Sequence, residues 1–150
     1  MRPLIAAIAL AGVALAGCSE RAGPKPNRAM CFDFKAPKAQ VTPGGSAEAA
    51  AADDCVRRWA YSLAPSRDEA GAVAEAAAAA CATQLSRWNQ QALNQPGGGG
   101  ETASLLTGEP TSPLAEHNTY VHARALLYVV QARAGSCAPP PAKNGTPDGL

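Results

Sequence analysis

The sequence predicts an all-α fold, a small three-helix bundle with disordered ends. Two observations support this prediction. Apolar residues recur every three or four positions over about 54–64, 67–94 and 113–134, and that spacing places their side chains on one face of a helix. The segments between and beyond these ranges are rich in glycine and proline, which end helices and form turns. We therefore expect three helices that pack through their apolar faces.

The first helix is expected to begin at Asp53 and Asp54, because aspartate is a good N-cap and its charge is favourable at a helix start. Its apolar stripe consists of Val56, Trp59, Ala60 and Leu63. The side chains left on other faces are those of Arg57, Arg58, Tyr61 and Ser62. Pro65 is expected to end the helix.

The second helix is expected to begin at Arg67, because Ser66 before it and Glu69 in its first turn have the spacing of a capping box. Its stripe is rich in alanine and runs through Ala70, Ala74, Ala77, Cys81, Leu85, Trp88 and Ala92. Small side chains let a neighbouring helix approach closely, so this stripe predicts a packing face or, where uncovered, a binding groove. A proline followed by four glycines at 96–100 ends the helix and opens a flexible loop that continues to about Thr111.

The third helix is expected to begin with Ser112 as its cap and Pro113 at its first position. Gly135 is a C-terminal cap signal. The segment 125–130 is apolar all round, so we expect this helix to be the most buried of the three. The residues after Cys137 begin with a run of prolines and end in a polar sequence, which predicts a disordered tail over 138–150.

The N-terminus has the layout of a secretory signal, with Arg2 before an apolar run from Leu4 to Ala14. The next residues, Leu15-Ala16-Gly17-Cys18, resemble the lipobox of bacterial lipoproteins. The resemblance implies cleavage before Cys18, a diacylglycerol group on its thiol and acylation of the new amino terminus, which together anchor a protein stably. A transmembrane helix is the alternative, but about 14 apolar residues rise only about 21 Å, less than the ~30 Å hydrocarbon core.

The lipobox resemblance also implies a location. The protein would be lipid-anchored on the periplasmic side of the cell envelope, and Ser19 after the cysteine, in place of aspartate, favours the outer membrane over the inner one. The chain then divides into a signal peptide at 1–17, a lipidated flexible tether at 18–52, a helical domain at 53–137 and the tail. Within the tether, Phe32 and Phe34 beside Cys31 are expected to form a short strand or a hydrophobic clip onto the core.

The four remaining cysteines are an even number in a compartment that oxidises thiols. Four cysteines allow three pairings, and the sequence does not decide among them. We favour Cys55 with Cys81, because both lie in helices expected to form an antiparallel hairpin, and Cys31 with Cys137. Strictly antiparallel packing would leave the first pair several ångströms out of step, whereas an oblique crossing would bring them together.

The charge balance of the chain argues against one class of partner and describes the tether. Removing Arg2 with the signal peptide leaves twelve basic and twelve acidic residues, so no nucleic acid is expected as a partner. Five basic and two acidic residues between 19 and 38 give the tether a charge of +3. This stretch is either a solvated linker or a segment that rests on anionic headgroups.

The sequence contains few signs of catalytic chemistry. His117 and His122 are five positions apart and point about 140° apart on a regular helix, so they do not chelate one metal. We expect no metal site, no cofactor and no enzymatic activity. The alternative is a small envelope enzyme that uses one of these histidines, and it requires a cleft with a carboxylate or hydroxyl in reach. A polar patch of His117, Tyr120 and Arg124 is a weaker candidate for binding an anion.

Arg57 and Arg58, next to Trp59 and Tyr61, are the candidate binding residues, since arginine forks hold oxyanions and aromatic faces stack on sugars. The stretch from Cys55 to Ala64, continuing to Cys81, is similar to small uncharacterised envelope proteins of Gram-negative bacteria, which implies no activity. The expected function is therefore a non-enzymatic binding or accessory module with an unknown envelope partner. A second hypothesis is an inhibitor or immunity-type lipoprotein that inserts the loop 96–111 into an envelope enzyme.

Overall fold

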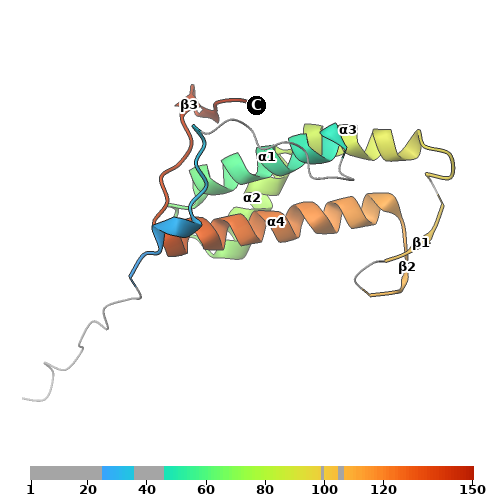
Figure 1. The fold of residues 1–150 in the computed structure, drawn as a ribbon, viewed down its shortest axis with the longest axis horizontal. Helices are drawn as coiled ribbons and strands as arrows, with labels where there is room; N and C mark the ends of the chain where they lie inside the picture. Colours follow the sequence, from blue (N-terminus) through green and yellow to red (C-terminus); the bar gives the residue numbers. More distant parts are fainter. Residues whose placement is uncertain (1–24, 36–45, 99, 105–106) are drawn as a thin grey trace, which may run out of the picture.

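The computed structural model describes residues 25–35, 46–98, 100–104 and 107–150. The predicted signal peptide at 1–17, Cys18 and the parts of the predicted tether at 19–24 and 36–45 lie outside the described residues. The fold is mainly helical, as predicted, but the described residues form four α-helices instead of three. In Figure 1, α1 and α4 run lengthwise along each other, and α3 continues the same layer. None of the helices in the described ranges is long and apolar enough to cross a membrane.

Helix α1 (Ala47–Leu63) begins two turns earlier than expected. Ser46 is its N-cap, and the serine hydroxyl accepts a hydrogen bond from the backbone N–H of Ala49. Alanine has the highest helix propensity of any residue type, so the alanine-rich segment after Ser46 is helical and leads into Asp53. The prediction that Asp53 and Asp54 cap the helix was wrong, and residues 47–52 belong to the helical domain instead of the tether.

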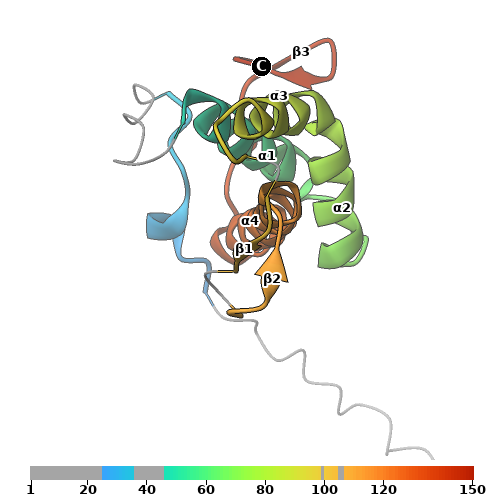
Figure 2. The same cartoon turned by 90° about the vertical axis from the view of Figure 1, so that its right-hand side faces the viewer.

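The predicted second helix is broken at Cys81 into α2 (Ala70–Ala80) and α3 (Ala82–Leu93). Cys81 has φ −102° and ψ 14°, outside the helical region, and caps both segments. Figure 2 views α1, α3 and α4 along their axes, and α2 crosses beside them in a different direction. This change of direction places the buried Cys81 against α1. The expected capping box does not form, because the Ser66 hydroxyl bonds to the backbone N–H of Asp68.

Helix α4 (Pro113–Gly135) is the central helix and packs against α1, α2 and α3. Ser112 caps its N-terminus, as predicted. The prediction that this helix is the most buried was wrong, because α1 has six buried residues among 17 and α4 has six among 23. Ala125, Tyr128 and Val129 are buried, whereas Leu126, Leu127 and Val130 are exposed. The core is small and is built mainly from alanine and valine, with Tyr61 as its largest fully buried side chain. Tyr61 therefore lies inside the bundle, although the helix pattern had placed it on another face.

Two disulfides connect Cys55 with Cys81 and Cys31 with Cys137, the pairing that the helix layout favoured. The second bond holds the segment 25–35, which includes the 3₁₀ turn η1 (Arg28–Met30), against the C-terminal end of α4. Phe32 and Phe34 pack on the core, and the Tyr61 hydroxyl accepts a hydrogen bond from the Phe32 N–H at 3.2 Å. Of the two alternatives for these residues, the hydrophobic clip is the one present.

The C-terminal residues were predicted to be a disordered tail, and this was wrong. Strands β3 (Ala142–Lys143) and β4 (Thr146–Pro147) form a small antiparallel hairpin. Pro140 and Pro147 are buried against the body of the protein. Arg58 donates a hydrogen bond to the carbonyl oxygen of Asp148 at 2.7 Å, and this bond ties the hairpin to α1.

Candidate functional site

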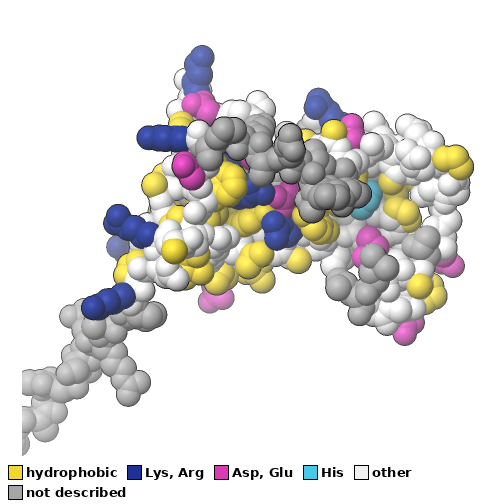
Figure 3. All heavy atoms as spheres, in the orientation of Figure 1, with side chains coloured by type: hydrophobic (Ala, Val, Ile, Leu, Met, Phe, Trp, Pro, Cys, Tyr) yellow, Lys and Arg dark blue, Asp and Glu magenta, His cyan; other side chains and the backbone are white. Residues whose placement is uncertain are grey.

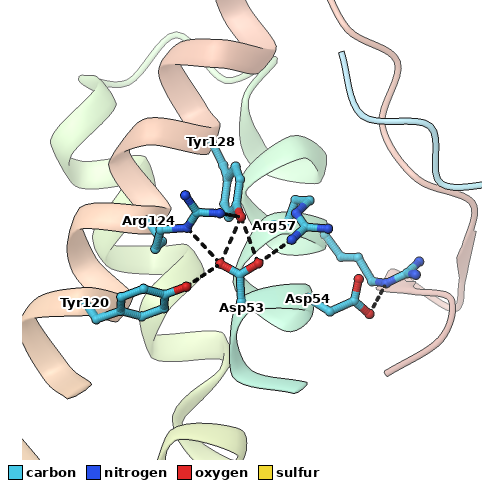
Figure 4. A network of polar contacts seen from close by, with 7 residues as sticks. Asp53, Asp54, Arg57, Tyr120, Arg124 and Tyr128 are labelled. Atoms are coloured by element: carbon cyan, nitrogen blue, oxygen red, sulfur yellow. Dashed lines mark hydrogen bonds and ion pairs between the residues drawn. The ribbon is translucent and has the colours of Figure 1, made fainter. Parts of the chain in front are cut away.

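The most concentrated polar chemistry in the described residues surrounds Asp53. Its carboxylate accepts hydrogen bonds from Nε of Arg124 at 2.8 Å, from the Tyr128 hydroxyl at 2.8 Å and from the Tyr120 hydroxyl at 3.3 Å. It also forms an ion pair with Arg57, one turn later on α1. Figure 4 shows the four donors converging on this one carboxylate from α1 and α4. We call these five residues the Asp53 cluster.

Helix periodicity brings the cluster together. Asp53 and Arg57 are four positions apart on α1, and so are Tyr120, Arg124 and Tyr128 in succession on α4, so each set lies on one helix face. The two faces meet because α1 and α4 pack side by side. The side chain of Asp53 is only 12% exposed, so the two arginines, and not water, stabilise its negative charge.

The hydrogen bonds and charges of the cluster fix its protonation states. Burial alone would raise the pKa of Asp53, but the hydrogen bonds from Arg124 and Tyr128 and the charges of Arg57 and Arg124 outweigh burial and lower this pKa below 3.8. Burial and the Asp53 charge raise the pKa of Tyr128 to about 12. Near neutral pH the cluster therefore holds two guanidinium groups, one carboxylate and neutral tyrosines, with a net charge of +1.

A groove of about 580 Å³ opens beside the cluster, between α1, α4 and the segment around η1. We call it the arginine groove. Its apolar walls include Met30, Phe32, Leu127 and Val130. Its polar side chains include Arg57, Arg124 and Tyr128. The Arg57 guanidinium lies 4.3 Å from the centre of the Phe32 ring, and that of Arg124 lies 4.6 Å from the Tyr128 ring centre, so aromatic faces hold both cations in position.

The structure separates the two predicted binding residues. Arg57 lines the arginine groove, whereas Arg58 is only 6% exposed. Nε of Arg58 bonds to Asp54 at 2.9 Å, and its guanidinium also reaches the C-terminal hairpin. Arg58 therefore holds the fold together, and Arg57 is the one of the pair that faces a groove.

The structure also separates the two histidines. The ring of His117 stacks on Trp88 with 3.6 Å between centres, and burial lowers its pKa. Its Nδ1 lies 2.8 Å from Asn89. Tyr120 and Arg124, which the sequence grouped with His117, belong to the Asp53 cluster instead, although Tyr120 also contacts the Trp88 ring edge-on.

His122 lies in a second groove of about 550 Å³ between α2 and α4, lined also by Thr119 and Gly71. Its Nδ1 is 3.1 Å from the Glu75 carboxylate, so the groove has the carboxylate that the enzyme hypothesis required. Both side chains face solvent, with exposed fractions of 37% for His122 and 69% for Glu75. Neither side chain is buried as the Asp53 carboxylate is, and no group of three metal-ligating side chains occurs in the described ranges.

The two remaining candidate surfaces are the alanine-rich stripe and the loop predicted at 96–111. The alanine-rich stripe is an interior packing face, because Ala74, Ala77 and Cys81 are buried. Part of the loop predicted at 96–111 is more ordered than expected, since β1 (Thr102–Ala103) pairs with β2 (Pro110–Thr111). This hairpin projects from the end of the bundle opposite η1 (Figure 1).

Sequence reasoning missed Asp53 and Tyr128 as site residues. Asp53 was interpreted as a helix cap and Tyr128 as part of an apolar segment. The four-residue spacings from Asp53 to Arg57 and from Arg124 to Tyr128 were the available signal. No protein-family model, curated protein or solved structure matches this chain, so the candidate site is defined by its own geometry.

Proposed function

We propose that this protein is a lipid-anchored, non-enzymatic binding module on the periplasmic side of the cell envelope, at the outer membrane, and that it binds through the arginine groove. The observation that carries the proposal is the combination of apolar walls with two guanidinium groups held rigidly at one side of the groove. Such a surface fits a ligand that presents an anionic group next to an apolar one.

The state of the Asp53 cluster favours binding over catalysis. A general base needs a lone pair that is free to take a proton and a pKa near the working pH. The Asp53 carboxylate is engaged by four donors, and its pKa is lowered. Its chemical role is to hold Arg57 and Arg124 in fixed positions, and this lowers the entropy that the two cations would lose on binding a partner.

The anchor and the compartment are part of the same proposal. The lipobox at 15–18 supplies the anchor through Cys18. Two disulfides in so small a chain support an oxidising compartment.

The inhibitor hypothesis remains a second candidate, favoured by one observation. The β1–β2 hairpin within 96–111 projects beyond the helices, as a loop that enters a cleft in a target would. If this hypothesis holds, deletion of 101–109 abolishes inhibition of the target enzyme and leaves the arginine groove unaffected.

Photo-crosslinking from the groove tests the proposed function. A photoreactive residue at Ala134, an exposed groove residue, is compared with one at Ala79, an exposed alanine on α2. We expect an envelope component to be crosslinked from position 134 but not from position 79, and mass spectrometry of the N-terminal peptide to show acyl groups that are absent in Cys18→Ser. Equal yields at the two positions would contradict the groove as the binding surface, and an unmodified Cys18 would contradict the anchor.

A further inference from the structure

The outward side of α4 is an apolar surface on an otherwise well-packed helix. Leu126, Leu127 and Val130 are 43%, 49% and 49% exposed. Met30 from η1, 37% exposed, lines the arginine groove with Leu127 and Val130. A helix that is apolar on all sides is normally buried on all sides. Figure 3 shows the hydrophobic side chains gathered over α4 and the adjoining segment. This face is therefore suited to contact with a second apolar phase.

The charges beside this face are mostly positive. Lys25 and Arg28 belong to the segment that carries Met30, and the Asp53 cluster contributes Arg57 and Arg124 with Asp53. Four cations and one carboxylate leave an excess of +3. In Figure 3 the basic side chains lie within and around the hydrophobic area. A second copy of the chain would bring like charges together, whereas an anionic lipid surface complements both the charge and the apolar side chains.

The position of the anchor supplies an independent argument. Covalent geometry limits the distance from Cys18 to Lys25 to at most about 25 Å. Lys25 begins the described segment that leads into η1, on the same side as the apolar face. An acyl group on Cys18 would therefore hold this end of the molecule, and not the end with the β1–β2 hairpin, close to the bilayer.

We propose that the face formed by Met30, Leu127 and Val130, with Arg57 and Arg124 beside it, docks on the anionic lipid surface to which the chain is anchored. The orientation argument rests on the proposed lipid anchor, and the charge and apolar arguments do not. The lipid phosphate would take the place of the anionic group expected in the arginine groove, and the apolar side chains would enter the headgroup region.

A tryptophan reporter tests this docking. The full chain carrying Leu127→Trp is added to vesicles of phosphatidylglycerol and phosphatidylethanolamine with brominated acyl chains, which quench tryptophan fluorescence on contact. Leu93→Trp is the matched control, because Leu93 is 48% exposed and is the last residue of α3. The C-terminal end of α3 lies far from η1 (Figure 1). The signal of the parent chain, from Trp59 and Trp88, is subtracted from both.

We expect quenching several-fold stronger at position 127 than at position 93, and weaker quenching in neutral phosphatidylcholine vesicles or at high salt. Equal quenching at the two positions, or none at either, would overturn the docking. So would a blue shift of the position 127 reporter that grows with protein concentration in the absence of vesicles, because that result would identify a second copy as the occupant.

Mass spectrometry of the N-terminal peptide distinguishes the proposed lipid anchor from the proposed docking. Acylated Cys18 without quenching specific to position 127 would leave the anchor in place and overturn the docking. Quenching specific to position 127 with unmodified Cys18 would support the docking and overturn the anchor.

Discussion

At the scale of single residues, Gly135 marks the end of α4 as the sequence predicted, but a glycine is needed there for a different physical reason. It was interpreted as a C-terminal cap signal, a role in which glycine usually adopts a left-handed conformation. In the structure Ser136 has that conformation, with φ 47°. Gly135 is required because a side chain there would occupy the space of the disulfide. A Cβ atom would lie 2.6 Å from Sγ of Cys137 and 2.8 Å from Sγ of Cys31.

Gly135→Ala is therefore expected to lower the free energy of unfolding by about 1–3 kcal/mol, the usual cost of overpacking. Gly71→Ala is the control, because Gly71 lies in α2 with nothing within 4 Å of the added methyl group. That change is expected to stabilise by up to about 1 kcal/mol. Urea unfolding of both variants checks the prediction, and a neutral result for Gly135→Ala would show that the disulfide shifts freely to accommodate the methyl group.

Asp53→Asn is expected to lower the free energy of unfolding at pH 7 by about 2–4 kcal/mol, since it removes the charge that compensates two partly buried arginines. The pKa of Asp53 is lowered in the folded state. The stabilisation from its charge is thus fully present above its unfolded value of 3.8 and is lost as the pH falls through the folded value. The difference between the two proteins should shrink below about pH 4.

Urea unfolding at pH 7 and at several lower pH values measures that difference. Glu101→Gln, a change at an exposed carboxylate, is the control and should leave the stability unchanged. A deficit of Asp53→Asn that stays constant down to the most acidic condition would contradict the assigned role of the charge.

At the scale of the elements, the best predictions came from patterns that local chemistry decides. Ser112 and Pro113 marked the start of α4 correctly, because a cap and a first-turn proline act within one helical turn. Such patterns could not predict the break at Cys81. The apolar stripe of the predicted second helix continues through Cys81 without interruption, and only the contact with Cys55 on another helix requires the change of direction. Asp53 was misassigned for the same reason, since three of its four partners lie on α4.

Replacing Cys55 and Cys81 by alanine tests how much α2 and α3 depend on their disulfide. The bond closes a loop with a sequence separation of 26, for which the chain-entropy model gives about 3–4 kcal/mol. We expect the double variant to lose that amount in urea unfolding and α2 to exchange its amide hydrogens faster than α4. Uniform protection of α2 and α4 in the variant would contradict a local role for the bond.

At the scale of the whole molecule, the segment 25–35 and α4 form one unit through the disulfide between Cys31 and Cys137. Replacing both cysteines by alanine is expected to loosen Met30 and Phe32, and with them one wall of the arginine groove. The helices should keep their circular dichroism near neutral pH, while crosslinking from position 134 should decrease. Full crosslinking in that variant would show that the groove does not need this wall.

The disulfide between Cys31 and Cys137 also determines how the molecule bears mechanical load. The four α-helices of the described residues all lie between these two cysteines in the chain, so they are inside a closed covalent loop. A force applied between residue 25 and the C-terminus passes from Cys31 directly to Cys137 and does not stretch the helices. If a chain fixed at its N-terminal side is pulled at its other end, the C-terminal hairpin bears the load, whereas the four helices remain folded for as long as that single sulfur–sulfur bond is intact.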